Sequence, residues 1–533
     1  MPDVTLFVRS SRLCVRMSFF NSKDPMPTTT TPQQRGFLSD IAVLVALAFG
    51  LTLLHVATNG QYGFHRDELA TVDDARHLAW GYVAYPPLTP FLGRVSLEAF
   101  GPSLRGIRFF PALAMGASVI LAGLMAYEMG GKRFAQVVAA LAVAIAPVPL
   151  RAGALLQYVA FDYLWWVVIA YLTIRLLRTD DPRLWVGIGA TVGLGMLTKY
   201  SVLFLVAGLL VGLVMTDARK YLKSRWLWIG VALSVLIFLP NLIWQIQHQF
   251  ISMDFLRHIH ARDVRIGRTD GFLSDQLKIV TNFITIPLWV AGLVALLALP
   301  EFKMYRPVAW MFIVPFVLFM IAKGRGYYMA PAYPMLLAAG TVAFERWATA
   351  SSLMAARSGW LRAATFALMA IGGMAVVAVA LPLAPVNSAW WHRIDDSDFK
   401  EEIGWPELTG EVARMWNSLP GEEKSRTAIL ASNYGEAGAV DLYGPALGLP
   451  QAISGVNSYW QRGYGDPPPQ TLIVLGLSGD DVEYFFTSCQ LSGHVTNRYG
   501  VKNEETSDHP DIFVCQPPRS SWPEFWAKFR HFG

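Results

Sequence analysis

Charged residues are scarce in this chain of 533 residues, of which they make up 16%, against about 25% in an average soluble domain. Apolar residues are abundant instead: they account for 53% of the sequence, and the mean hydropathy is +0.37. This composition excludes a compact cytosolic enzyme. It predicts that most of the chain is one body embedded in lipid.

Cysteine is also rare. The three cysteines form no Cys-x-x-Cys pair and no Cys/His ligand spacing, so zinc modules, iron–sulfur clusters and thioredoxin-like chemistry have no support in the sequence. The chain lacks a phosphate-binding glycine loop, a Ser/His/Asp order and a dinucleotide fingerprint, so ATP-driven transport and cofactor redox chemistry have no basis in the sequence. The net charge of +5 is small for this length, and nucleic acid is not an expected partner.

Long apolar runs dominate the first two thirds of the chain. Each run is predicted to be a helix, because lipid offers the backbone no other hydrogen-bonding partner. The eleven predicted transmembrane helices lie near residues 37–57, 107–127, 134–150, 159–177, 184–198, 202–215, 226–244, 283–299, 308–321, 328–344 and 361–383. Residues 1–36 are predicted to be a disordered cytoplasmic N-terminus, and residues 37–384 a membrane-embedded module.

The basic residues gather in alternate loops, for example Lys132 with Arg133 and Lys303 with Arg306. The positive-inside rule assigns these loops to the cytoplasm. It places outside the two long segments 58–106 and 246–282, and everything after about residue 385. We therefore expect a multi-pass protein of the cell membrane whose site is built from the long outer loops.

Residues 385–533 differ in composition and predict a soluble extracytoplasmic α/β domain. Residues 427–431 and 471–477 are typical of short buried strands, and residues 407–419 of an amphipathic helix. Cys489 and Cys515 both lie in this domain. In an oxidising compartment they are predicted to form a disulfide, and two buried free thiols are the alternative.

Three acidic residues are candidates for catalysis. Asp67 and Glu68 form a pair just beyond the first membrane span, where a carboxylate could take a proton from a substrate at the interface; an ordinary solvated loop is the alternative. Asp162 lies at the outer end of an otherwise apolar span, where a carboxylate is costly unless it faces a polar cavity or has a partner. That partner could be purely structural, such as Arg151 or a tyrosine hydroxyl.

Most basic residues lie in the predicted cytoplasmic loops, but several lie on the outer side. These outer cations could hold a phosphate group. Contact with anionic lipid is the alternative for such residues. The candidate substrate-binding residues are Lys199, Lys323, Arg325, Tyr327, Tyr328, Tyr85 and His65. The second outer segment is basic as well, which fits an anionic head group. Because no tight metal-ligand spacing is present, we expect no cofactor and no obligatory metal, although a divalent ion is possible.

The order of these motifs resembles that of a known superfamily. The matching features are Asp67-Glu68 followed by Tyr85-Pro86-Pro87, the Asp162 span, Thr198-Lys199, Pro240-Asn241-Leu242-Ile243-Trp244 and the turn from Lys323 to Pro334. Together they resemble the polytopic GT-C glycosyltransferases of the protein O-mannosyltransferase and lipid A aminoarabinose transferase superfamily. The resemblance covers about residues 37–345. It implies a sugar donor linked to polyprenyl phosphate and transfer, in the outer leaflet, to a lipid, glycan or protein acceptor.

The resemblance also implies roles for individual residues. Asp67 would act as the general base on the acceptor hydroxyl, with Glu68 as its neighbour and Asp162 at the second acidic position. Lys323 and Arg325 would stabilise the leaving phosphate, with a secondary contribution from Lys199. One position departs from the pattern, because Tyr85 stands where the aminoarabinose transferases carry a lysine.

Two other functions fit parts of the sequence. A flippase or transporter of polyprenyl lipids would bind a lipid phosphate without breaking a bond, but it should carry ionisable groups near the bilayer midplane and internal repeats. Here the charges lie at the outer rim, which favours the transferase. A non-catalytic scaffold is the weaker alternative, and in that case Asp67→Asn would have no effect.

Overall fold

The computed structural model describes residues 32–350 and 352–533. Contacts divide the chain into residues 1–39 and 40–533, and the candidate site lies in the second unit. The first 31 residues of the predicted disordered segment lie outside the described residues. Residues 32–36 are helical rather than disordered, because α1 (Pro32–Thr58) begins before the predicted span.

All of the predicted spans coincide with helices. They are α1, α5 (Phe109–Glu128), α6 (Arg133–Ala144), α8 (Tyr158–Thr179), α9 (Leu184–Met196), α10 (Val202–Val214), α11 (Arg225–Gln247), α14 (Ile286–Ala298), α15 (Arg306–Ile321), α16 (Tyr333–Thr349) and α17 (Ser352–Ala380). Within the described residues six helices are long and apolar enough to cross a membrane, or up to eight if each of two bent helix pairs counts as one span. The chain is a membrane protein, and the number of eleven crossings stays a prediction.

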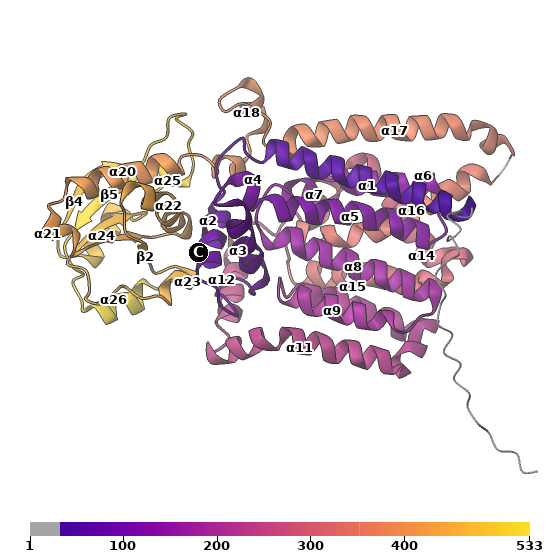
Figure 1. The fold of residues 1–533 in the computed structure, drawn as a ribbon, viewed down its shortest axis with the longest axis horizontal. Coiled ribbons are helices and arrows are strands. Elements are labelled where there is room, and N and C mark those ends of the chain that lie inside the picture. Colours follow the sequence, from indigo (N-terminus) through magenta and orange to yellow (C-terminus); the bar gives the residue numbers. More distant parts are fainter. Residues whose placement is uncertain (1–31, 351) are drawn as a thin grey trace, which may run out of the picture. The chain divides into compact units, whose positions relative to one another are not determined.

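Glycine permits the closest helix contacts of the bundle. A Cβ atom on Gly189 of α9 would collide with the backbone of Gly230 in α11, and one on Gly292 of α14 would collide with the backbone of α16. In lipid, the hydrophobic effect does not drive helices together, so their association depends on close packing. Small residues at such crossings let the helix backbones come into direct contact. Figure 1 shows these helices running roughly parallel in the bundle.

The first outer segment forms three helices: α2 (Arg66–Arg76), α3 (Leu88–Phe100) and α4 (Leu104–Ile107). The start of α2 is fixed by a capping box, in which the His65 ring accepts a hydrogen bond from the Asp67 N–H and Glu68 accepts one from the His65 N–H. The second outer segment contains α12 (Ile251–Arg265). Figure 1 shows α2, α3 and α12 between the bundle and the C-terminal domain.

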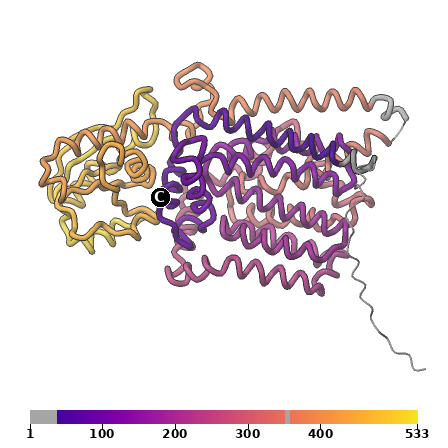
Figure 2. The backbone as a smooth tube through the Cα atoms, in the orientation of Figure 1, coloured from indigo at the N-terminus to yellow at the C-terminus, as the bar shows by residue number. Residues whose placement is uncertain are grey.

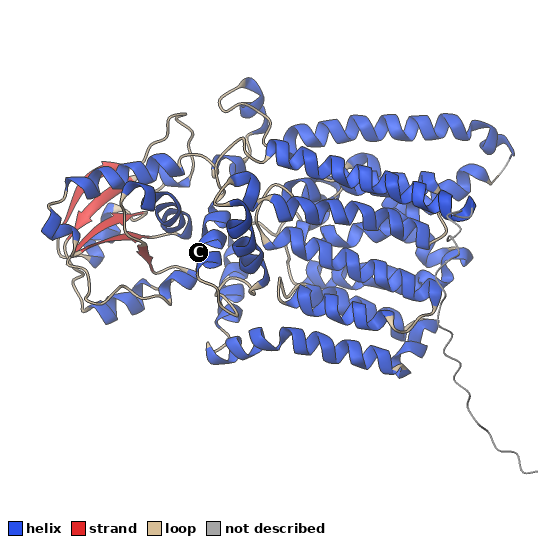
Figure 3. Cartoon of the chain, in the orientation of Figure 1, coloured by secondary structure: helices blue, strands red, loops and turns tan. Residues whose placement is uncertain are grey.

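The C-terminal domain is the predicted α/β domain. Its five strands are β1 (Thr427–Ala431), β2 (Ala452–Ser454), β3 (Thr471–Leu475), β4 (Cys489–His494) and β5 (Asp511–Cys515). Their order in the sheet is β2-β1-β3-β5-β4. The strands β2, β1 and β3 are parallel, and β5 runs antiparallel to both of its neighbours, β3 and β4. Figure 3 shows the strands in red. The helices α20 (Trp405–Ser418), α22 (Tyr434–Tyr443), α24 (Gly479–Phe485) and α26 (Trp522–Phe529) pack around the sheet.

The two domain cysteines form a disulfide, as predicted. Cys489 and Cys515 are directly paired residues of β4 and β5 and are joined by a 2.05 Å S–S bond. The end of the chain returns to the second outer segment, where the Phe532 ring lies 5.8 Å from the ring of Phe255 in α12. The tube in Figure 2 follows this return.

Candidate active site

Asp67 lies in the first turn of α2, at the junction of the bundle and the C-terminal domain. Its Oδ2 accepts a hydrogen bond from the Gln157 amide, just before α8. Its Oδ1 accepts one from the Tyr434 hydroxyl of α22, at 2.9 Å. The side chain is half-buried. The carboxylate is thus held from two sides and still reaches solvent.

Glu68 occupies a different environment from Asp67. It is fully buried and pairs with the equally buried Arg108, with 2.5 Å between Oε2 and Nη2 and 2.9 Å between Oε1 and Nε. Oε1 also accepts from the Leu156 N–H at 2.8 Å, and Oε2 from the His65 N–H at 2.9 Å. A carboxylate has about four acceptor positions, and all are in use. The predicted catalytic role of Glu68 is not supported, because this side chain fixes α2 in place.

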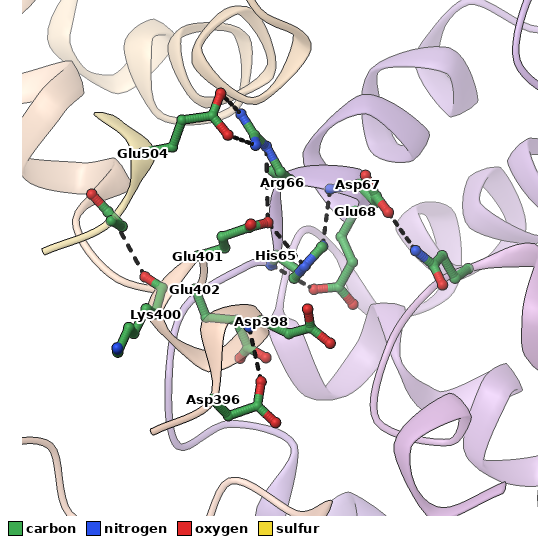
Figure 4. A network of polar contacts seen from close by, with 12 residues as sticks. His65, Arg66, Asp67, Glu68, Asp396, Asp398, Lys400, Glu401, Glu402 and Glu504 are labelled. Atoms are coloured by element: carbon green, nitrogen blue, oxygen red, sulfur yellow. Dashed lines mark hydrogen bonds and ion pairs between the residues drawn. The ribbon is translucent and has the colours of Figure 1, made fainter. Parts of the chain in front are cut away.

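His65 and Tyr85 are also engaged by protein groups. His65 is buried, caps α2 with Nδ1 and places Nε2 3.3 Å from Glu401 Oε2, as Figure 4 shows. The Tyr85 hydroxyl donates to Asp74 Oδ2 at 2.8 Å. Both polar groups already have protein partners, and the predicted substrate contacts of the two residues stay a prediction.

Lys199 lies among tyrosine rings. Its Nζ is 4.1 Å from the centre of the Tyr328 ring, 4.8 Å from that of Tyr158 and 5.7 Å from that of Tyr327. These contacts are attractive cation–π interactions. Lys199 is half-buried, and no acidic group within the described ranges forms an ion pair with it. The structure therefore brings together three of the predicted binding residues, Lys199, Tyr327 and Tyr328.

Asp162 lies one helical turn after Tyr158 in α8 and is 6% exposed. Its Oδ2 accepts a hydrogen bond from Ser201 Oγ at 2.9 Å. Arg151, the alternative partner, instead pairs with Asp396 at 2.7 Å and Asp398 at 3.1 Å. Asp162 is thus placed beside the Lys199 segment, and no hydrogen bond or ion pair joins it to Asp67 in the part of the chain described.

Arg325 is not a free cation. It forms a two-pronged pair with the buried Asp263, in which Nε and Nη2 each lie 2.7 Å from one carboxylate oxygen. Arg262 and Arg268 approach the same carboxylate to 3.9 and 4.0 Å. Three guanidinium groups around one carboxylate leave a local charge of 3 − 1 = +2. The second outer segment therefore supplies positive charge that Arg325 alone does not.

Lys323 is separate from this group. It is exposed, its φ of +50° lies in the left-handed region, and its side chain has no hydrogen bond or ion pair to any residue that the structure describes.

The N-terminal end of α2 is clamped to the C-terminal domain by charge. Arg66 donates to both carboxylate oxygens of Glu504 and, at 3.2 Å, to Glu505 Oε1. Glu401 lies 3.9 Å away, and Figure 4 shows Glu504 and Glu401 beside Arg66. Burial raises the pKa of Glu505 to about 7.

The other end of α2 is clamped in a similar way. Arg462 of the C-terminal domain forms ion pairs with Asp73 and, at 3.1 Å, with Asp74. Burial raises the pKa of Asp74 to about 7, and burial together with the charge of Asp73 raises the pKa of Asp441 to about 7. The helix that carries Asp67 therefore cannot shift without breaking buried ion pairs.

No cluster of three or more His, Cys, Asp or Glu side chains in the described ranges is arranged to hold a metal ion.

The sequence is similar to two curated enzymes. A family model described as dolichyl-phosphate-mannose-protein mannosyltransferase matches residues 84–244. The lipid A galacturonosyltransferase RgtD of Rhizobium johnstonii is 29% identical over 39% of this chain and 46% of its own length. The undecaprenyl phosphate-alpha-4-amino-4-deoxy-L-arabinose arabinosyl transferase 1 of Pseudomonas fluorescens is 27% identical over 60% and 62%. The chain thus spans less than two thirds of either relative.

Two solved structures share the architecture over most of the chain. ArnT from Cupriavidus metallidurans bound to undecaprenyl phosphate aligns with a TM-score of 0.56 at 15% identity, over 89% of this chain and 97% of that one. The oligosaccharyltransferase of Archaeoglobus fulgidus aligns with a TM-score of 0.53 at 14% identity, over 92% and 76%. Both are GT-C membrane proteins. The chain has the GT-C fold.

The GT-C fold predicted from the motifs is thereby confirmed, together with its C-terminal sheet domain. The family match includes Tyr85, Asp162 and Lys199, and it ends at residue 244. It contains neither Asp67 nor the arginine cluster of the second outer segment. The roles predicted for Asp67 and for these arginines therefore depend on their positions in the structure and not on the family match.

Sequence reasoning missed several residues that build this GT-C site. Arg108 had a signal, since it is a lone arginine at the start of an apolar run. Gln157 stands next to the recognised Asp162 segment, but an uncharged amide carries no signal of its own. Tyr434 had none, because it lies in the C-terminal domain and meets Asp67 only through tertiary structure.

Proposed function

We propose that this GT-C protein is a membrane glycosyltransferase that moves a sugar, with inversion, from a polyprenyl-phosphate donor to an extracytoplasmic lipid, glycan or protein acceptor. The main support is the Asp67 carboxylate, which is half-buried and held by Gln157 and Tyr434. A positioned carboxylate at a polar junction is suited to remove a proton. The relatives also support this proposal, because their names describe glycosyl transfer and one uses an undecaprenyl phosphate sugar.

The reaction needs one base and a stabilised leaving group. Asp67 takes the proton of the acceptor hydroxyl while the hydroxyl oxygen attacks the anomeric carbon. The bond between that carbon and the phosphate oxygen breaks, and its electron pair stays on the polyprenyl phosphate. A phosphate monoester is a good leaving group when cations stabilise its growing charge, so no acid is required.

Lys199 is the main candidate for contact with the leaving phosphate. It is the half-buried cation among Tyr158, Tyr327 and Tyr328. No carboxylate within the described ranges lies at ion-pair distance from it, although Asp162 is close enough to interact with it electrostatically. The position of Lys199 beside Tyr158, whose ring centre is 6.2 Å from that of Tyr85, would compensate for the lysine that Tyr85 replaces.

The arginine cluster provides a second source of positive charge. Arg325 pairs closely with Asp263 and neutralises its charge. The positive charges of Arg262 and Arg268 are therefore not neutralised by this carboxylate. Lys323 receives no role, because nothing in the described site contacts its side chain.

The site is proposed to face away from the cytoplasm. In support, Lys132 and Arg133 follow α5 and therefore lie at the opposite end of that helix from α4 and the first outer segment. Lys132 donates its N–H to Glu345, near the end of α16, so two basic loop regions meet at that end. Basic loops of this kind are retained in the cytoplasm.

The proposed transferase is tested by the release of free polyprenyl phosphate in detergent. A panel of labelled polyprenyl-phosphate sugars is offered with crude envelope acceptors to the wild type, Asp67→Asn and the matched control Asp480→Asn, which alters an exposed carboxylate on α24. We expect Asp67→Asn to lose about 10²-fold or more of the release, and the control to retain it.

The outcomes separate the candidate functions. Equal release by Asp67→Asn and wild type would refute Asp67 as the base. If the wild type binds a labelled donor and releases no polyprenyl phosphate with any acceptor, the flippase alternative gains support, and lipid translocation is measured next. If chelation abolishes release and divalent ions restore it, the expectation of a metal-independent reaction is wrong.

A further inference from the structure

The C-terminal domain reaches directly into the proposed site. Tyr434 is the first residue of α22 and lies three residues after Ala431, the end of β1. Its hydroxyl donates to Asp67 Oδ1 at 2.9 Å, across 367 residues of sequence. The contact joins the α/β domain to the side chain proposed as the base.

The Tyr434 side chain is held in place by its surroundings. Asn433 caps α22 in a capping box with Glu436. The Arg66 guanidinium lies over the Tyr434 ring at 5.4 Å. Further along α22, a Cβ atom on Gly438 would come within 2.8 Å of the Leu69 backbone, so the helix docks directly against α2. A hydroxyl fixed in this way cannot follow Asp67 if that side chain rotates.

The carboxyl ends of the parallel strands point toward α2, and α/β domains usually bind ligands at these ends. The parallel strands β1 and β3 end at Ala431 and Leu475, and α22 begins just beyond the first of them. Ligands in open parallel sheets bind outside the carboxyl ends of the strands. In this protein the carboxyl end of β1 faces the helix that carries Asp67.

On the basis of the proposed function, we infer that Tyr434 is a positioning residue of the active site, supplied by the C-terminal domain to orient the Asp67 carboxylate toward the acceptor hydroxyl. Gln157 holds Oδ2 and Tyr434 holds Oδ1, which fixes the plane of the carboxylate. Burial raises the pKa of Tyr434 well above its usual value, so the hydroxyl remains a hydrogen-bond donor throughout the assay range. Orientation of a base before attack lowers the barrier for proton transfer.

The test is Tyr434→Phe, which removes only the hydroxyl. We expect kcat for polyprenyl phosphate release to fall on the order of 10-fold, with KM for the donor unchanged. A loss confined to kcat would show that the hydroxyl acts in the chemical step and not in donor binding. Arg66 and Glu401, the other charged groups facing the pair, are unchanged in this variant.

The matched control is Tyr443→Phe, at the other end of α22. Its ring packs against Phe64 at 6.4 Å, and its hydroxyl bonds no residue in the described ranges. It should keep the wild-type kcat and KM. Melting temperatures of both variants, measured beside the wild type, show whether any loss comes from unfolding.

Three results decide the inference. If folded Tyr434→Phe keeps the wild-type kcat while Asp67→Asn is inactive, Tyr434 does not position the base, and the proposed function stands. A rise in kcat would also overturn the inference, because the tyrosine would then obstruct the acceptor. If Asp67→Asn itself remains active, the proposed base fails, whichever result Tyr434→Phe gives.

Discussion

Lys199 offers the sharpest test of how the leaving phosphate is stabilised. Lys199→Met removes the charge and keeps a flexible apolar side chain among the three tyrosine rings. A unit charge pair at 4 Å contributes about 4 kcal/mol at an effective dielectric constant near 20. Lys199 is only half-buried, so solvent screening reduces this to about 2–3 kcal/mol. That corresponds to roughly 30- to 150-fold in rate.

The effect should fall on kcat more than on donor binding, because the phosphate gains charge as the bond breaks. Single-turnover release of polyprenyl phosphate is measured for the wild type, Lys199→Met, Lys199→Arg and a control, Lys502→Met, at an exposed position of the C-terminal domain. Lys199→Arg should recover part of the rate, since it restores the charge with a different shape. If folded Lys199→Met keeps kcat within threefold of the wild type, the reasoning is wrong.

Two further predictions concern the support of α2. Glu68→Gln should destabilise the protein by about 1–3 kcal/mol, because the fully buried Arg108 loses the nearer of its two carboxylate partners and keeps only Glu402, at 3.3 Å; a melting temperature equal to that of the wild type would contradict this. Asp74, Asp441 and Glu505 have pKa values raised to about 7, above about 4 in the unfolded chain. The folded state therefore binds more protons between these values, so their contribution to stability is complete below about pH 4 and is lost as the pH rises through 7. The melting temperature should fall between pH 5 and pH 8, and Asp74→Asn should flatten the fall; a rise would refute the assignment.

The sequence predicted the elements of the fold better than their lengths. Apolar runs and charge gaps located each helix of the bundle, because a span in lipid must be apolar along its whole length. The run at 134–150 nevertheless breaks into α6 and a short helix from Pro147, and α9 has only 13 residues. Pattern alone does not distinguish a full crossing from a shorter buried helix.

The candidate site was only partly predictable, because ionisable residues carry a signal and their partners do not. Asp67 stood out as an acid beside a membrane span, and it lies at the junction of both modules. Glu68 gave the same signal, but tertiary contact with Arg108 consumes its acceptor positions. Arg325 looked like a free cation until folding brought Asp263 to it, 62 residues away in the sequence.

The two contacts of Asp67 also determine when the site can form during synthesis. Gln157 follows Asp67 by 90 residues and Tyr434 by 367. At about 5–20 residues per second, the ribosome delivers Tyr434 roughly 20–70 s after Asp67. Through most of that interval the first outer segment is already made, but its carboxylate lacks the second hydrogen bond. The growing chain therefore carries an incomplete site until its last domain has been translated and folded.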